Sequence, residues 1–255
     1  MRYAAILFGV GCPAVGSIHH QHRTGDGLPY GHQILTRHVE YRPDIEVIVE
    51  LPAATSDEIV AAAKRAKAAQ KAWAAMPAPA RGRVIANVGR LVEANKELLA
   101  KLVTREMGKV YAEALGEVQE VIDTCDFFIG EGRRMYGQTV PSEMPNKNLF
   151  TFRMPVGSTL IITAGNFPAA VPSWYIVPAL LTGNSVIWKP AEFTPAVANA
   201  LTAIFHAGGV PKDILITLVA EGATTFEAMD KCLSLGLINK VGFTGSTEVG
   251  RKIGA

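Results

Sequence analysis

The chain has 255 residues, of which 49% are hydrophobic and 19% charged, so it can bury a sizeable core and is neither disordered nor fibrous. The formal net charge is +2 and there is no long basic run, which argues against nucleic acid or an anionic membrane as a partner. No apolar run is long enough to span a bilayer. The cysteines, Cys12, Cys125 and Cys232, are odd in number and widely spaced, which favours a reducing, cytoplasmic compartment over a disulfide framework.

The first 40 residues differ from the rest of the chain. Five of the six histidines lie here, among glycines and arginines without clear periodicity: His19, His20, His22, His32 and His38. A metal site that includes His19 and His22 is conceivable, but no carboxylate or cysteine pattern completes a tetrahedral ligand set. We therefore expect no metal, and we interpret residues 1–40 as an unassigned leader that is disordered or aberrant.

The next segment is predicted to be mainly helical. Apolar alternation over residues 45–51 indicates a strand, and Thr55 and Glu58 have the spacing of a capping box at the start of a helix. Two further helices are predicted at about 80–104 and 110–135, because apolar residues recur there every three or four positions. We interpret these stripes as packing surfaces. The turn between the last two helices, Glu106-Met107-Gly108-Lys109, is interpreted as structural.

A strand–helix–strand unit follows. Residues 159–163 form a β-branched run, residues 169–181 an apolar helix, and residues 185–189 a second buried strand that Pro190 ends. The helix should stop at residues 182–184, because Gly183 suits a C-cap. Two strands joined by a helix imply a parallel sheet.

The alternation continues to the end of the chain, with helices predicted at 196–207 and 223–233 and strands at 214–219 and 238–243. This pattern predicts an α/β fold with a doubly wound parallel sheet. Residues 244–246 then bend into a helix start, where free N–H groups can hold a phosphate.

Polar residues stand where such a sheet binds ligands. Asn166 follows the carboxyl end of one strand, and Lys189 and Glu192 follow the end of the next. The amide can donate a hydrogen bond to an oxyanion, and an ammonium near a carboxylate can hold a ribose or phosphate. Position alone leaves a second interpretation open, in which Asn166 is a turn residue and Lys189 a solvated strand end.

Three motifs occur in order: NFP at residues 166–168, WKPAEFTP at 188–195 and FTGSTEVG at 243–250. Together they resemble the signatures of the NAD(P)-dependent aldehyde dehydrogenase superfamily, and the resemblance runs from about Glu46 to the last residue. It implies a Rossmann-like dinucleotide-binding domain over residues 41–255, with residues 137–155 as a protruding β arm. Family members associate through this arm, so a homo-oligomer, dimer or tetramer, is expected.

The resemblance also implies site residues. Asn166 would donate to the oxyanion, and Phe167 and Trp174 would line the aldehyde tunnel, unless these two are ordinary core aromatics. Lys189 and Glu192 would hold the adenosine ribose, and a carboxylate there repels a 2′-phosphate, which favours NAD over NADP. The other cofactor-binding residues would be Thr163, Gly222, Phe243, Gly245, Ser246 and Val249.

Some family features differ or lie elsewhere. Ala164-Gly165 replaces a common Pro-Trp, and residues 220–223 have one glycine where the family has two. The family's general base and nucleophilic cysteine come after the position of Ala255, so the resemblance implies a truncated chain whose catalytic domain is absent. The expected function is NAD-dependent oxidation of a small aldehyde or semialdehyde to the acid, with this chain alone inactive. The alternative is a short, non-catalytic protein that binds a dinucleotide or a protein partner.

Overall fold

The computed structural model describes residues 2–8 and 45–254. Strands β1 (Arg2–Phe8) and β2 (Ile45–Pro52) form an antiparallel pair, which confirms the strand predicted at residues 45–51. β1 lies in the leader, where the sequence analysis assigned no element. The five leader histidines and Cys12 fall outside the described residues.

Four helices follow in the described chain before the arm: α1 (Ser56–Ala75), α2 (Ala78–Ala94), α3 (Lys96–Met107) and α4 (Tyr111–Glu131). The predicted capping box is present, because Thr55 Oγ1 accepts the Glu58 N–H at 3.3 Å and Glu58 Oε2 accepts the Thr55 N–H at 2.8 Å. α1 buries one apolar stripe, which includes Ile59, Ala62, Ala66 and Trp73.

The single helix predicted at 80–104 is wrong, because the chain breaks at Asn95 into α2 and α3. The Asn95 amide donates to the Leu91 carbonyl at 2.7 Å, and its backbone leaves the helical region at φ −111° and ψ 11°. The apolar periodicity runs through this break and so conceals it. Leu98, an apolar residue within the helix predicted at 80–104, is 61% exposed.

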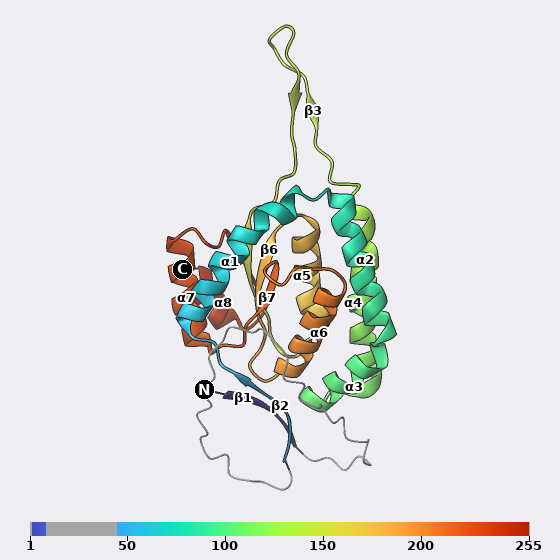
Figure 1. The fold of residues 1–255 in the computed structure, drawn as a ribbon, viewed down its shortest axis with the longest axis vertical. Coiled ribbons are helices and arrows are strands. Elements are labelled where there is room, and N and C mark those ends of the chain that lie inside the picture. The colour runs from blue at the N-terminus through green and yellow to red at the C-terminus, as the bar shows by residue number, and fades with distance from the viewer. Residues whose placement is uncertain (1, 9–44, 255) are drawn as a thin grey trace, which may run out of the picture.

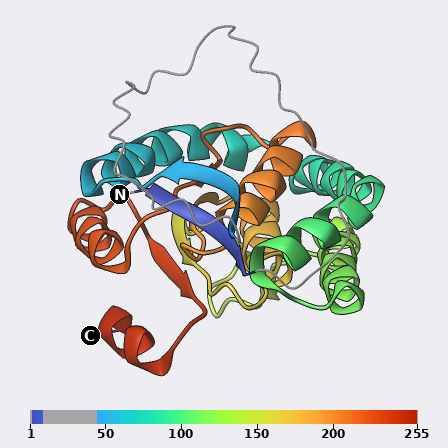
Figure 2. The same ribbon diagram turned by 90° about the horizontal axis from the view of Figure 1, so that it is seen from below.

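The described residues after the arm form a parallel sheet in the order β7-β6-β5-β8, which confirms the predicted doubly wound α/β fold. Helices α5 and α6 cover one face and α1 and α7 the other (Figures 1 and 2). The strands are β5 (Ser158–Ile162), β6 (Ser185–Lys189), β7 (Leu215–Thr217) and β8 (Lys240–Phe243), and the helices are α5 (Ala170–Leu181), α6 (Pro195–Ala207), α7 (Gly222–Ser234) and α8 (Thr247–Gly254).

The winding of the sheet reverses beside β5. The chain passes outward from β5 through β6 to β7 and then returns to form β8 on the other side of β5. The register places Ile162 opposite both Lys189 and Phe243, so the three strands end at one level. Open α/β sheets bind ligands at this kind of reversal.

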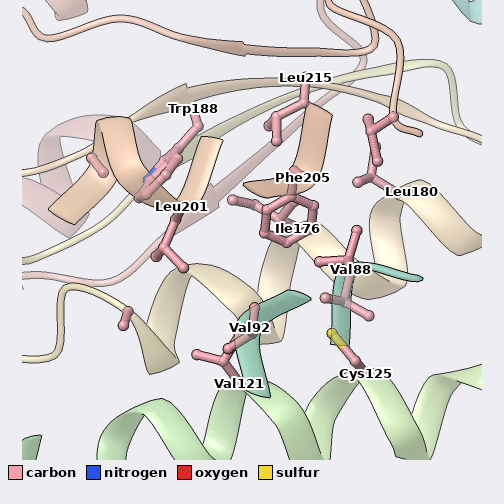
Figure 3. Close-up of a cluster of buried hydrophobic side chains, with 14 of the residues drawn as sticks. Val88, Val92, Val121, Cys125, Ile176, Leu180, Trp188, Leu201, Phe205 and Leu215 are labelled. Atoms are coloured by element: carbon pink, nitrogen blue, oxygen red, sulfur yellow. The ribbon is translucent and has the colours of Figure 1, made fainter. Parts of the chain in front are cut away.

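The main core lies between the sheet and helices α2, α4, α5 and α6. Figure 3 shows Ile176 and Phe205, from α5 and α6, facing Val88 of α2 and Cys125 of α4. Burial, with the nearby Asp126 carboxylate, raises the pKa of the Cys125 thiol to about 12. Cys232 is also buried, and burial raises its pKa too. Neither thiol is therefore ionised at neutral pH, as a nucleophile needs to be.

The arm projects from the body as a hairpin (Figure 1). Its strands, β3 (Thr139–Val140) and β4 (Leu149–Phe150), pair antiparallel within the β arm expected at residues 137–155. The arm carries large exposed apolar side chains, including Phe150, Phe152 and Met154. Its role in association stays a prediction.

Arg81 joins two helix ends inside the protein. Its guanidinium is buried and donates to the Leu181 carbonyl at 2.8 Å and to the carbonyls of Trp73, Ala74 and Met76. These carbonyls lie in the last turns of α5 and α1, where helical donors run out; the Trp73 carbonyl also accepts the Met76 N–H at 3.2 Å.

We predict that Arg81→Met lowers the free energy of unfolding by about 3 kcal/mol, because it leaves several buried carbonyls without a charged donor. Urea unfolding followed by circular dichroism measures the change. Arg83→Met, at an exposed position of the same helix, should stay within about 0.5 kcal/mol of the unsubstituted chain. Equal unfolding midpoints for the two variants would contradict this account of Arg81.

Candidate functional site

A cleft of about 370 Å³ opens at the carboxyl edge of the sheet, where β5, β6 and β8 end. Its walls come from the segments after these strands and from the starts of α7 and α8. The cleft brings together all eight residues that the sequence analysis assigned to the cofactor: Thr163, Lys189, Glu192, Gly222, Phe243, Gly245, Ser246 and Val249.

Lys189 and Glu192 form an ion pair in this cleft. Lys189 ends β6 and is 7% exposed, and its Nζ lies 2.5 Å from Oε1 of the half-buried Glu192. Lys189 is therefore not a solvated strand end, and that second interpretation is wrong for this residue. An ammonium and a carboxylate held side by side offer a donor and an acceptor to the two hydroxyls of a ribose.

The turn after β8 is built around the ring of Phe243. A Cβ at Gly245 would lie 2.6 Å from this ring, so a larger residue does not fit without displacement. The backbone at Gly245 can consequently approach a ligand closely. Tyr175 fixes the turn, because its hydroxyl lies 3.2 Å from the Phe243 carbonyl oxygen and 2.8 Å from the Thr244 hydroxyl. The free N–H groups at the start of α8 follow this turn and suit a phosphate.

Gly165 lies at a position where a side chain would clash with its neighbours. A Cβ there would lie 2.3 Å from the ring of Phe193 and 3.0 Å from the Ala191 methyl group. Phe193 thus occupies the space beside the Ala164-Gly165 segment that departs from the family pattern. The sequence analysis missed Phe193 as a cleft residue, although it directly follows Glu192 in the second motif.

Three more apolar cleft residues were also missed. They are Phe226 and Met229 on α7 and Ile253 on α8. At helical spacing such side chains are typical of core packing, so the sequence carries no signal that distinguishes them. They give the cleft an apolar part in addition to the polar pair, which suits a ligand with a flat apolar part and a polar part.

The three residues assigned to the aldehyde side lie outside this cleft. Asn166 is exposed in the loop between β5 and α5, and Phe167 is 40% exposed beside it. Trp174 on α5 is 48% exposed and borders a second, open hollow with Phe127 and Phe128 of α4. Neither Phe167 nor Trp174 is a core aromatic in the described part of the chain.

Glu106, from the turn interpreted as structural, anchors α6 next to the cleft. It is 6% exposed, and its two oxygens accept the N–H groups of Ala196 at 2.6 Å and Val197 at 2.8 Å. Burial raises the pKa of this carboxyl to about 7, against the opposing effect of the two hydrogen bonds. Gly108, with φ 75°, ends α3 in the left-handed conformation.

Within residues 2–8 and 45–254, no cluster of three or more His, Cys, Asp or Glu side chains is arranged to hold a metal ion. Among the helices of that same part of the chain, none combines the length and apolarity needed to cross a bilayer.

Comparison with known proteins agrees with this geometry. The sequence profile of the Aldehyde dehydrogenase family matches residues 35–255. Aldehyde dehydrogenase family 7 member A1 of Pisum sativum is 38% identical over 209 residues, which are 80% of this chain and 40% of the pea protein.

Solved structures give the same result. The crystal structure of an E. coli NADP dependent enzyme has a TM-score of 0.77 and 35% identity, over 82% of this chain and 43% of that one. A NAD-dependent benzaldehyde dehydrogenase from Corynebacterium glutamicum has a TM-score of 0.76 and 30% identity, over 82% of this chain and 45% of its own. The chain spans less than half of the length of these proteins.

The raised pKa of Glu106 predicts a pH-dependent stability. Between the ordinary carboxyl pKa of 4.5 and about 7, the folded chain holds a proton that the unfolded chain releases. The free energy of unfolding should therefore fall as the pH rises through this range, by about 1–3 kcal/mol.

Urea unfolding at pH 5, 6 and 7.5 measures this dependence. Glu106→Gln should flatten this part of the profile, whereas Glu97→Gln, at an exposed position of the same helix, should retain it. An unchanged slope in Glu106→Gln would contradict the assignment.

Proposed function

The chain belongs to the aldehyde dehydrogenase family, and on this premise we propose that it is the cofactor-binding part of an NAD-dependent enzyme that oxidises an aldehyde or semialdehyde to the carboxylic acid. The observation that carries the proposal is the single cleft at the winding reversal of the sheet, where all eight expected cofactor residues meet. Nicotinamide dinucleotides are the cofactors of proteins similar to this chain, which include both NAD- and NADP-dependent enzymes.

The residues of the cleft fit such a cofactor. Lys189 and Glu192 would hold the adenosine ribose, while the turn at Gly245 and Ser246 would lie against the pyrophosphate. Val249 and the apolar wall formed by Phe226, Met229 and Ile253 would pack on the adenine. When bound, the dinucleotide accepts a hydride. The residues of the protein are proposed to carry out the remaining steps of the reaction.

Asn166 is proposed as the oxyanion donor. Attack of a thiolate on an aldehyde carbonyl turns the carbonyl oxygen into an oxyanion, which an exposed side-chain amide can bind. Cys125 and Cys232 are buried and have raised pKa values. We therefore propose that the nucleophile is a residue other than Cys125 and Cys232. The general base is likewise proposed to be none of the residues that the structure describes. Phe167 and Trp174 would contact the aldehyde on the same side.

The choice of NAD over NADP rests on Glu192. A carboxylate at the ribose accepts hydrogen bonds from its hydroxyls but repels the charge of a 2′-phosphate. Lys189 moderates this repulsion, because it already pairs with Glu192. The carboxylate is nevertheless the group that a 2′-phosphate would have to approach.

Two wider properties complete the proposal. The complete protein is proposed to be cytoplasmic, in keeping with the buried and unpaired Cys125 and Cys232. It is also proposed to form a homo-oligomer through the arm at residues 137–155, whose exposed apolar side chains and short strands suit pairing with a second copy.

We predict that the chain binds NAD more tightly than NADP and that Glu192→Gln raises the affinity for NADP relative to NAD by about tenfold, since it removes the like-charge repulsion. Isothermal titration calorimetry with both dinucleotides measures the two constants. Glu227→Gln is the control, because Glu227 is exposed on α7 and does not line the cleft. A flat NAD titration would remove the cofactor assignment, and an unchanged NADP to NAD ratio would remove the role of Glu192.

We predict that Asn166→Ala lowers kcat by about 100-fold or more, because the oxyanion loses a donor in the transition state. The measurement is the rate of NADH formation from propanal. It uses the protein with the chain length found in its source, which intact mass establishes first. The NAD dissociation constant should stay unchanged in this variant, since Asn166 lies outside the cofactor cleft. A variant that retains full kcat would exclude Asn166 as the oxyanion donor.

A further inference from the structure

A buried carboxylate holds the start of α5. Glu117 lies on α4, its residue is 2% exposed, and its Oε1 accepts the N–H groups of Ala169 at 2.7 Å and Ala170 at 3.2 Å. These donors are at the N-terminal end of α5, where no helical carbonyl is available to them. The segment that follows Asn166 is thereby attached to a helix about fifty positions earlier in the chain.

Lys109 extends this contact to Phe167. The side chain of Lys109 is 8% exposed, and its Nζ bonds to Oε2 of Glu117. On its other side the same Nζ lies 3.7 Å from the centroid of the Phe167 ring. The ammonium therefore lies between a carboxylate and an aromatic face, both of which attract a cation.

The loop that carries Asn166 is thus fixed at both ends. On one side Gly165 is packed under the ring of Phe193, and on the other Phe167 and Ala169 are held by Lys109 and Glu117. Asn166 itself is exposed. Its backbone is consequently held in place through its neighbours in the chain.

We propose that Lys109 and Glu117 are positioning residues for the aldehyde side of the site, which fix the Asn166 amide and the Phe167 ring relative to the reacting carbonyl. This proposal rests on the proposed role of Asn166 in oxyanion binding. Small displacements of groups that orient a reacting carbonyl cost one to two orders of magnitude in rate, so loss of the pair should affect turnover and leave cofactor binding intact.

A comparison within the protein separates this role from simple helix capping. Glu106 holds the start of α6 with one oxygen on each of two N–H groups. Glu117 instead uses one oxygen for both N–H groups of α5 and directs the other to Lys109. Capping alone does not need the lysine. Lys109 contacts the ring of Phe167, which is 40% exposed. This contact therefore orders a surface loop and contributes little to the stability of the core.

The decisive experiment is nuclear magnetic resonance of the labelled chain carrying Lys109→Met. The Asn166 side-chain amide and the Phe167 ring resonances should move towards random-coil positions, while backbone resonances of β6 stay in place. Lys109→Arg should restore the original positions, because it keeps a cation over the ring. Lys101→Met, at an exposed lysine of α3, is the matched control. Unmoved Asn166 and Phe167 resonances in Lys109→Met would overturn the proposal.

Glu117→Gln provides an independent variant, because it keeps the shape of the side chain and removes its charge. Exchange of the Ala169 amide proton should accelerate at least tenfold, without comparable acceleration in the β5 strand. Equal acceleration throughout β5 would indicate a general structural role and would count against positioning.

Kinetics and cofactor binding complete the test. In the protein that turns over propanal, both variants should lower kcat at least tenfold and leave the KM for NAD within twofold; an unchanged kcat would overturn the proposal. Failure of the unsubstituted chain to bind NAD would instead contradict the proposed function, and the resonance measurements would still decide whether the pair orders the loop.

Discussion

The geometry of the sheet edge depends on two buried carboxylates that bind helix N-termini. Helices α5 and α6 start just beyond β5 and β6, so their free N–H groups face the region where the ligand cleft forms. Each buried N–H without a partner would cost about 1–3 kcal/mol. Glu117 and Glu106 satisfy these donors. Helices α3 and α4 therefore do more than cover the core, because they fix where the polar residues of the edge stand.

The sheet and the residues that meet in the cleft were predictable because their signals are local. The β-branched run of β6, the proline after it and the motif residues Lys189 and Glu192 are neighbours in sequence. A parallel sheet then brings the strand ends to one level, and the register of Ile162 with Lys189 and Phe243 follows from that geometry. Cleft residues on three strands could thus be assigned without knowledge of any side-chain contact.

The buried charged residues were not predictable in the same way. Charged side chains are rarely buried without partners, so a charged residue in a sequence usually indicates a solvated face. The burial of Arg81, Glu106 and Glu117 therefore goes against the usual interpretation of their charge. Each of the three has a backbone partner 52 to 100 residues away, and no local pattern encodes such contacts. Asn95 illustrates the related limit of periodicity, since its side-chain bond to Leu91 ends a helix while the apolar stripe continues.

The end of β5 joins the two halves of the site. Thr163, Ala164 and Gly165 line the cleft, and the next residue, Asn166, is the proposed oxyanion donor on the aldehyde side. In the proposed reaction a hydride passes directly between carbon atoms, so a bound dinucleotide and aldehyde would have to meet within van der Waals distance of this point. One side of the junction is fixed by strand register and the packing of Phe193 on Gly165, and the other by the charges of Lys109 and Glu117. Because the two sides rely on separate interactions, we expect substitutions to weaken the proposed cofactor binding and the proposed carbonyl alignment independently, although one residue of backbone separates the groups that they hold.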